Sequence, residues 1–377
     1  MSYKLGISIG ILVLILLFWM QFLVSYFLPF DKEAFFSLLK FEWLIVYSLA
    51  LIISIRTSGI VSIYSLFLIL SFVFNYARIF LEMISDYQLS STDLFSRIEL
   101  SIDTEITLLI LIVNLLLFSL LSYVMFYRKS TISLAHKRSY TLPSKYLIYI
   151  LLVPVILFNI QDLIYILNNG YLSLFNGDYH EKMNFLSLIL PRLMFIAFMF
   201  FLAGVPEELE FKKISYIYLV VLLLSALKGQ RGEILLFILM LVWYHNTMYQ
   251  KNFAKLNFKY IALIPIVFIS FSQFLLAFRS NVDVEPNNFL YEFFRINGIS
   301  INIPAYLIEF NESMSSGGVP YFFAPIVDYF YRVFIDRDIF YQGPSVDLLD
   351  ASNSLSHHMI YFINPDAYFM GNGTGSS

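Results

Sequence analysis

The chain has 377 residues, of which 59% are hydrophobic and 14% are charged, and its formal net charge is −3. A soluble domain carries about 25% charged residues, so this composition excludes an ordinary soluble protein and predicts a polytopic helical membrane protein. The charge gives no indication of a nucleic-acid partner, and we expect none. The sequence has no cysteine, which excludes disulfides, thiolate metal sites and thiol catalysis.

Nine apolar segments recur between the N-terminus and residue 278, and we expect each to form a membrane helix. They cover roughly residues 5–27, 41–55, 60–82, 106–127, 146–168, 186–204, 214–228, 233–248 and 260–278. The first is too long for the apolar core of a signal peptide, which has about 7–15 residues, and no small-residue cleavage site follows it. The sequence therefore predicts a transmembrane domain over residues 1–278.

Lysine and arginine are unequally divided between the loops. With a cytoplasmic N-terminus, twelve of them fall on the cytoplasmic side: Lys4, Arg56, Arg128, Lys129, Lys137, Arg138, Lys145, Lys212, Lys213, Lys251, Lys255 and Lys259. Four fall in the outer loops: Lys32, Lys40, Arg97 and Lys182. Because cytoplasmic loops are enriched in these residues, the bias predicts a cytoplasmic N-terminus.

Residues 279–377 differ from the rest of the chain. They contain six prolines, many aromatic residues and charges of both signs, and no convincing membrane span. The number of preceding spans places this region outside the membrane, and it is too apolar to be disordered. We expect a helix-rich outer domain that packs on the membrane surface.

The stretch SALKGQRGEILLF, residues 225–237, places Lys228, Gln230, Arg231 and Glu233 between two apolar runs. Each flanking helix has about 15 apolar residues, or roughly 22 Å, against a hydrocarbon core of about 30 Å. The turn is therefore expected to lie below the outer surface, in a cavity of the protein. The next helix begins near Glu233, and its free N–H groups, together with the two cations, predict an anion site.

Three further arginines, Arg78, Arg192 and Arg279, join Lys228 and Arg231 in the outer half of the predicted membrane domain. An arginine at mid-membrane costs about 2.5–3.5 kcal/mol, so five such cations need a compensating anion. A lipid-linked diphosphate on the outer leaflet would supply it. The alternative is that these cations snorkel to the surface or pair with acids. The available acids are Glu82, Asp162 and Glu233.

The C-terminal stretch SLSHHMIYFINPDAYFMGNGTGSS, residues 354–377, resembles a motif of the bacterial O-antigen polymerase family, also called oligosaccharide repeat-unit polymerases. The matching residues are His357 or His358, Tyr361, Asn364, Pro365, Tyr368, Gly371, Gly373, Gly375, Ser376 and Ser377. The turn from Gly229 to Glu233 is similar to that family's Gly-x-Arg-Gly turn. Family members continue with further membrane helices, so we expect residues 279–377 to form a periplasmic loop domain that is cut short before them.

The resemblance implies a membrane glycosyltransferase that joins undecaprenyl-diphosphate-linked oligosaccharide units on the periplasmic face of the bacterial inner membrane. A sugar hydroxyl would attack the anomeric carbon of the growing chain, and lipid diphosphate would leave. The bilayer and a chain-length regulator protein are the other implied partners, and no cofactor is expected. An O-antigen ligase, which passes the same donor to a lipid A core, remains an alternative, as does a transporter of the lipid-linked oligosaccharide.

The reaction that the resemblance implies needs fixed cations where charge develops on the leaving diphosphate. Arginine suits this role because its fork meets phosphate oxygens bidentately. The candidate diphosphate-binding residues, with the first choices first, are Arg231, Arg279, Arg192, Lys228 and Arg78.

The attacking hydroxyl needs at most a positioned base, for which His357 and His358 are the candidates, with a structural role as the alternative. Glu233 completes the candidate catalytic set by orienting Arg231. The candidate substrate contacts are Gln230, Arg295 and Asp283. Three acidic pairs have a spacing found in metal sites: Asp31/Glu33, Asp103/Glu105 and Asp336/Asp338. Two carboxylates alone do not define metal coordination, so no metal is predicted.

Overall fold

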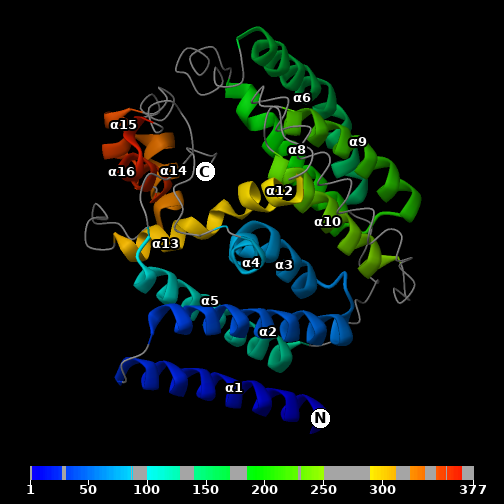
Figure 1. Ribbon diagram of the computed structural model, residues 1–377. Coiled ribbons are helices and arrows are strands. Elements are labelled where there is room, and N and C mark those ends of the chain that lie inside the picture. Colours follow the sequence, from blue (N-terminus) through cyan, green and yellow to red (C-terminus); the bar gives the residue numbers. More distant parts are fainter. Residues whose placement is uncertain are drawn as a thin grey trace. The chain divides into compact units, whose positions relative to one another are not determined.

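The computed structural model (Figure 1) describes residues 2–27, 31–85, 87, 100–127, 140–169, 185–227, 231–249, 289–310, 323–335, 345–353 and 355–366. Every regular element within these ranges is a helix, which confirms the expected all-α class. Five of the described helices are long and apolar enough to cross a membrane: Leu5–Leu23, Lys32–Ser58, Ile63–Ile84, Ile102–Phe126 and Thr141–Asn169. Shorter apolar helices follow at Ile189–Ala203 and Leu236–Met248. The protein is a polytopic membrane protein, and the expected segment 260–278 lies outside the described residues.

The chain divides into two compact units, and each contains a part of the expected outer domain. The first unit is Met1–Thr131 with Glu285–Ser315, and the second is Ile132–Val284 with Ser316–Ser377. The boundary expected near residue 278, between the transmembrane domain and the periplasmic loop domain, stays a prediction.

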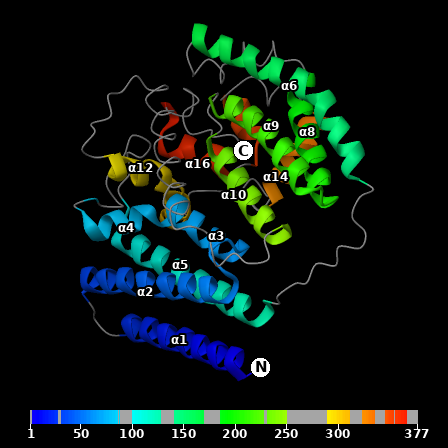
Figure 2. The same cartoon turned by 90° about the vertical axis from the view of Figure 1, so that its right-hand side faces the viewer.

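The first unit contains the N-terminal membrane helices and a short segment from later in the chain, Glu285–Ser315. Its elements are α1 (Ser2–Phe27), α2 (Lys32–Ser58), α3 (Ile63–Ser71), η1 (Phe72–Tyr76), α4 (Ala77–Ile84), α5 (Ile102–Phe126), α12 (Phe289–Asn297), η5 (Gly298–Ile301) and α13 (Asn302–Glu309). Helix α5 packs against both α1 and α2, and the two views of Figures 1 and 2 show these three side by side. Segment α12–η5–α13 packs on α4, η1 and α5.

Polar caps set the starts of the membrane helices in this unit. The Asp31 side chain accepts from the backbone N–H of Glu33, and Ser101 accepts from that of Thr104. Each satisfies a donor that the helix itself leaves free. Because of its cap, α2 begins nine residues before the expected start at 41 and includes Lys40 and Glu42, whose charges interrupt the apolar pattern.

Aromatic side chains form the core between α2 and the third span. Trp43 is fully buried, and its ring stacks on Tyr47 at 6.0 Å and on Phe72 at 6.5 Å between centroids. The hydroxyl of Tyr47 donates to the carbonyl oxygen of Leu68 at 3.2 Å. The third span is not a uniform α-helix, since Phe72–Tyr76 form a π-helix between α3 and α4. π-Helical turns are rare in proteins, and those that occur are often found at functional sites.

Among the described residues of the second unit are four long helices and three short ones. They are α6 (Thr141–Asn169), α8 (Phe185–Ala203), α9 (Glu208–Leu227), α10 (Arg231–Met248), α14 (Ala324–Phe334), α15 (Val346–Ala351) and α16 (Leu355–Ile363). The long helices share a core in which Phe198, Tyr218 and Phe237 lie 4.7–5.0 Å apart by ring centroids. Helix α9 begins at Glu208 instead of the expected 214, because polar residues form its first turns while the apolar part is as expected.

Candidate functional site

Arg78 lies in the first turn of α4, directly after the π-helix, and its side chain is 1% exposed. Its Nε donates to the carbonyl oxygen of Arg295 at 2.8 Å, and its Nη1 donates to Oδ1 of Asn302 at 3.2 Å. The guanidinium also lies 5.8 Å from the ring centre of Tyr87. Burying a guanidinium is costly unless protein groups accept its protons. Arg78 therefore ties the third membrane span to the segment α12–η5–α13.

Gly298 allows this close approach. A Cβ atom at this position would lie 3.0 Å from both Cγ and the backbone N of Arg78, and 3.2 Å from Cβ of Ala77. Two of these three atoms belong to the backbone or to a short side chain. A Cβ at 298 would crowd α4 unless a neighbour shifted by a few tenths of an ångström, so glycine favours the close packing of η5 on α4.

Arg295 contacts Arg78 although the two residues are 217 positions apart in the sequence. Its backbone carbonyl meets Arg78, and its guanidinium binds Glu292, with 3.1 Å from Nε and 2.8 Å from Nη2 to the same carboxylate oxygen. The two arginines are thus neighbours in the first unit, while the charge of Arg295 is partly balanced within its own helix.

A second tie joins α13 to the start of α5. Oε2 of Glu309 accepts from the backbone N of Ser101 at 3.0 Å and from its hydroxyl at 2.7 Å. Burial raises the pKa of Glu309, but hydrogen bonds from Thr104 and Ser101 outweigh it and hold that pKa below its ordinary value. Glu309 is therefore ionised at neutral pH and holds the end of the α12–α13 segment on the membrane helices.

Two of the acidic pairs considered for metal binding have structural partners. Asp31 caps α2, and Asp103 binds Lys32 at 2.7 Å. Among the described residues, no group of three or more histidines and carboxylates is arranged to hold a metal ion. The pair Asp336/Asp338 lies outside the described residues.

The two candidate histidines lie on α16 in the second unit. His358 Nε2 lies 3.1 Å from the carbonyl oxygen of Leu349. Burial lowers the pKa of His357, the Asp328 carboxylate partly raises it, and His358 lowers it again, so His357 favours its neutral form. A neutral imidazole is the protonation state that a general base needs.

Asp328 of α14 binds the turn that precedes α16. Its carboxylate accepts from the hydroxyl of Ser352 at 2.9 Å, and from the backbone N and Nδ2 of Asn353 at 2.9 and 2.8 Å. These bonds connect α14 to the turn between α15 and α16. Asp328 thus positions the helix that carries both histidines and contributes negative charge near His357.

The structure describes some of the cations that we expect around the anion site, and it leaves others out. Arg192 is exposed on α8, one residue after Pro191 inside that helix. The backbone of Arg231 begins α10, with Glu233 in its first turn, and the side chains of both residues lie outside what the structure describes. Lys228, Gln230, Arg279 and Asp283 lie entirely outside the described residues. Their expected roles stay predictions.

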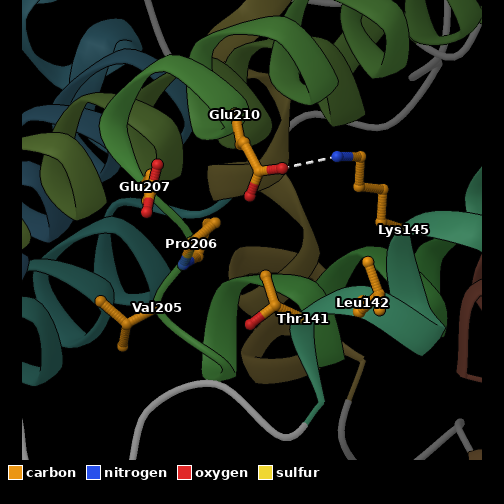
Figure 3. Close-up of a pocket in the computed structure, with 7 residues that line it drawn as sticks. All are labelled: Thr141, Leu142, Lys145, Val205, Pro206, Glu207 and Glu210. Carbon is orange, nitrogen blue, oxygen red and sulfur yellow. Dashed lines mark hydrogen bonds and ion pairs between the residues drawn. The ribbon is translucent and has the colours of Figure 1, made fainter.

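Figure 3 shows a cavity of about 280 Å³ in the second unit, lined by Thr141, Leu142, Lys145, Val205, Pro206, Glu207 and Glu210. Lys145 reaches across it to Glu210, with 2.5 Å between Nζ and Oε1. The predicted topology places these residues at cytoplasmic helix ends. We therefore do not place the anion site expected on the outer side at this cavity.

A cavity of about 260 Å³ in the first unit lies beside the Arg78 contacts. It is lined by Asn75 and Tyr76 of the π-helix, by Leu108, Leu111, Ile112 and Leu115 of α5, and by Ser300, Ile301 and Pro304. The α5 side is wholly apolar, whereas Asn75 and Ser300 supply polar groups. Such a cavity suits a ligand that is apolar along α5 and polar near Asn75 and Ser300.

Residues 9–377 match the family described as O-antigen polysaccharide polymerase Wzy. The chain belongs to this family. No curated protein and no solved structure matches the chain. Membership confirms the resemblance seen in the C-terminal motif. Wzy membership implies an O-antigen repeat-unit polymerase, and the family acts on lipid-linked oligosaccharide in a membrane.

Four residues that position the described parts of this Wzy protein were missed by sequence reasoning: Gly298, Asn302, Glu309 and Asp328. Each acts through a contact with a distant segment, so its own neighbours in the sequence give little signal. Asp328 was the most accessible to prediction, since it is the one acid on a helix that is otherwise mostly aromatic and aliphatic.

Proposed function

We propose that the protein joins undecaprenyl-diphosphate-linked oligosaccharide repeat units on the periplasmic face of the bacterial inner membrane. The family match over residues 9–377 carries this proposal. The bond between the anomeric carbon of the growing chain and its lipid diphosphate breaks. A new glycosidic bond forms to a hydroxyl of the incoming unit, whose proton passes to a base. Lipid diphosphate leaves, and no metal is required.

The leaving diphosphate is bound by Arg231 and Arg279, with Arg192 and Lys228 in support. The start of α10 at Arg231 favours this assignment, because the free N–H groups of a first helical turn attract anions. Two guanidinium groups bound to the diphosphate stabilise the charge that develops when the anomeric bond breaks. Glu233 orients Arg231, and Gln230 and Asp283 contact the sugar.

Arg78 acts by positioning the Arg295 segment instead of by touching phosphate. Its 1% exposure and its bonds to Arg295 and Asn302 support this division of roles. Arg295 then contacts phosphate or sugar from a fixed backbone. The cavity of about 260 Å³ in the same unit is apolar on its α5 side, which suits part of a lipid chain.

His357 is the preferred base, because its lowered pKa keeps the imidazole neutral at physiological pH. His358 shares its helix and is the second candidate. Asp328 positions both histidines, because its hydrogen bonds hold the turn that leads into α16.

The proposal is tested with purified lipid-linked repeat unit and reconstituted protein. Arg231→Ala and Arg279→Ala should abolish polymer while membrane insertion stays intact. Arg231→Lys should rescue poorly, because a point charge does not replace the bidentate fork. Arg56→Ala is the matched control, since Arg56 is exposed in the last turn of α2 at the predicted cytoplasmic end.

A normal ladder of polymer lengths from both alanine variants would contradict the diphosphate role. Transfer of the chain to added lipid A core without polymer would instead identify a ligase. Movement of the lipid-linked unit across the bilayer without any new glycosidic bond would identify a transporter.

A further inference from the structure

Helix α14, Ala324–Phe334, and its N-cap residue Phe323 carry a row of exposed apolar side chains, which we call the stripe. Phe323, Ile326, Phe330 and Phe334 are 50%, 57%, 55% and 73% exposed. Their spacing of three and four residues places them on one side of the helix. The rings of Phe330 and Phe334 stack at 5.7 Å between centroids, and Tyr329, also exposed, flanks the stripe.

The other side of α14 contacts the turn between α15 and α16, and we call these three helices one subdomain. Ala324 is buried, and Asp328 accepts the three hydrogen bonds from Ser352 and Asn353 described above. On a helical projection Asp328 lies about 160° from Phe330, since successive residues are separated by about 100°. The stripe cannot turn inward unless these hydrogen bonds break.

The chemistry of the stripe matches one occupant that is always within reach of this protein. Three phenylalanines and an isoleucine in one row form an apolar surface that water does not favour. Helix α14 has 11 residues. That is roughly 16 Å at about 1.5 Å per residue, too short to cross a hydrocarbon core of about 30 Å. A short amphipathic helix with an aromatic face is typical of segments that lie in the membrane interface.

We propose that α14 lies in the plane of the membrane interface, with the stripe of Phe323, Ile326, Phe330 and Phe334 inserted among the lipid head groups and upper acyl chains. The spans of the same chain anchor it in that bilayer, so the lipid surface is present at high effective concentration. The proposal rests on the chain being a membrane protein, and it does not depend on the polymerase reaction.

This placement has a consequence for α16. Because Asp328 ties α14 to the turn before α16, an inserted α14 holds His357 and His358 close to the level of the lipid head groups. The diphosphate of a lipid-linked sugar lies at that level, whereas a free oligosaccharide in solution does not.

The absence of cysteine from the sequence allows a direct test by single-cysteine spin labelling. Phe330→Cys, Phe334→Cys and Ile326→Cys are labelled with a nitroxide in the full chain, reconstituted in phosphatidylethanolamine–phosphatidylglycerol liposomes. Asp347→Cys and Asp350→Cys on α15 are the matched controls, since both residues are exposed and polar and lie in the same subdomain. Collision rates with oxygen, which concentrates in lipid, and with a water-soluble nickel chelate report depth.

The three stripe labels should collide with oxygen several-fold more, relative to the chelate, than the two α15 labels. Chelate access equal to that of Asp347→Cys would place the stripe in water and overturn the proposal. Protection from both reagents would mean that protein covers the stripe, and dipolar broadening between labels would identify that cover as a second copy of the chain. If one stripe variant fails to insert, the other two give the same measurement.

Discussion

At the scale of single residues, Arg78 shows how burial changes the meaning of an intramembrane charge. A cation in the outer half of a span suggests an anionic ligand when the sequence alone is considered. In the fold its side chain is 1% exposed and donates to Arg295 and Asn302. The same charge therefore holds two distant segments together.

Replacement of Arg78 should cost both stability and activity. Arg78→Ala leaves two buried acceptors without their donor, so we expect a loss of about 2–4 kcal/mol in the free energy of unfolding and little polymer. Arg78→Lys keeps the charge but not the geometry of two donors, so it should restore part of the stability. Thermal unfolding in detergent measures the first effect, and the repeat-unit assay measures the second. Arg56→Ala should change stability by about 0.5 kcal/mol or less, and an equal effect of both alanine variants would contradict the buried tie.

His357 should make stability fall in mild acid. Burial lowers its pKa in the folded state, whereas the unfolded chain keeps the ordinary value of 6.5. Above that value both states are neutral and stability is complete. As pH falls through 6.5, the unfolded state takes up the proton first, so stability declines until the folded pKa is reached.

The measurement is the unfolding temperature from about pH 8 to about pH 5, with His357→Gln for comparison. The variant should lose part of the acid sensitivity, while Asp328 and His358, the neighbouring ionisable groups, stay in place. Identical pH profiles for the two proteins would show that His357 does not titrate as its burial requires.

At the scale of secondary-structure elements, the π-helix and α5 together shape the cavity beside Arg78. Phe72–Tyr76 interrupt the third span and bring Asn75 and Tyr76 to one wall, and four aliphatic residues of α5 form another. The closing wall comes from η5 and α13, which Arg78 and Glu309 hold in place. The cavity exists because four elements meet, and none of them forms it alone.

Filling this cavity should reduce turnover without harming the fold. Leu111→Trp places a larger ring where the lipid chain is proposed to lie, so polymer yield should fall several-fold at equal membrane abundance. Phe118→Trp is the matched control, because Phe118 is exposed on the same helix but does not line the cavity. Equal yields from both variants would remove the cavity from the donor site.

At the scale of the whole molecule, the proposed reaction depends on which helix ends face the periplasm. The twelve-to-four division of loop cations predicts a cytoplasmic N-terminus and a periplasmic region after residue 279. Candidate site residues then fall on the outer side, and the cavity around Lys145 and Glu210 falls on the other. An inverted chain would exchange these assignments.

Single cysteines report this sidedness directly. Asp347→Cys should react with a membrane-impermeant maleimide applied from the periplasmic side, and Lys213→Cys should react only after the membrane is opened. Both residues are exposed, so failure to react reflects sidedness and not burial. Reaction of Lys213→Cys in sealed spheroplasts, with protection of Asp347→Cys, would reverse the site assignment.

Helix positions were largely predictable, and their ends were less so. The apolar segments expected at 106–127 and 146–168 correspond to α5 and α6, since an apolar run of membrane length is a local property. The start of α2 was misplaced because a capping aspartate, and not hydropathy, decides where that helix begins. The pairing of Arg78 with Arg295 could not be foreseen, since no local pattern links residues 217 positions apart.

The sequence by itself determined that this is an all-helical membrane protein, because transfer of an apolar segment into lipid depends on the composition of that segment alone. It also carried the motif by which the family was recognised. Only the tertiary structure decided that Arg78 is a buried tie, that Gly298 packs closely on a neighbouring helix, and that Asp328 supports the histidine helix. These roles arise from contacts between distant segments, whose energies depend on how the whole chain packs.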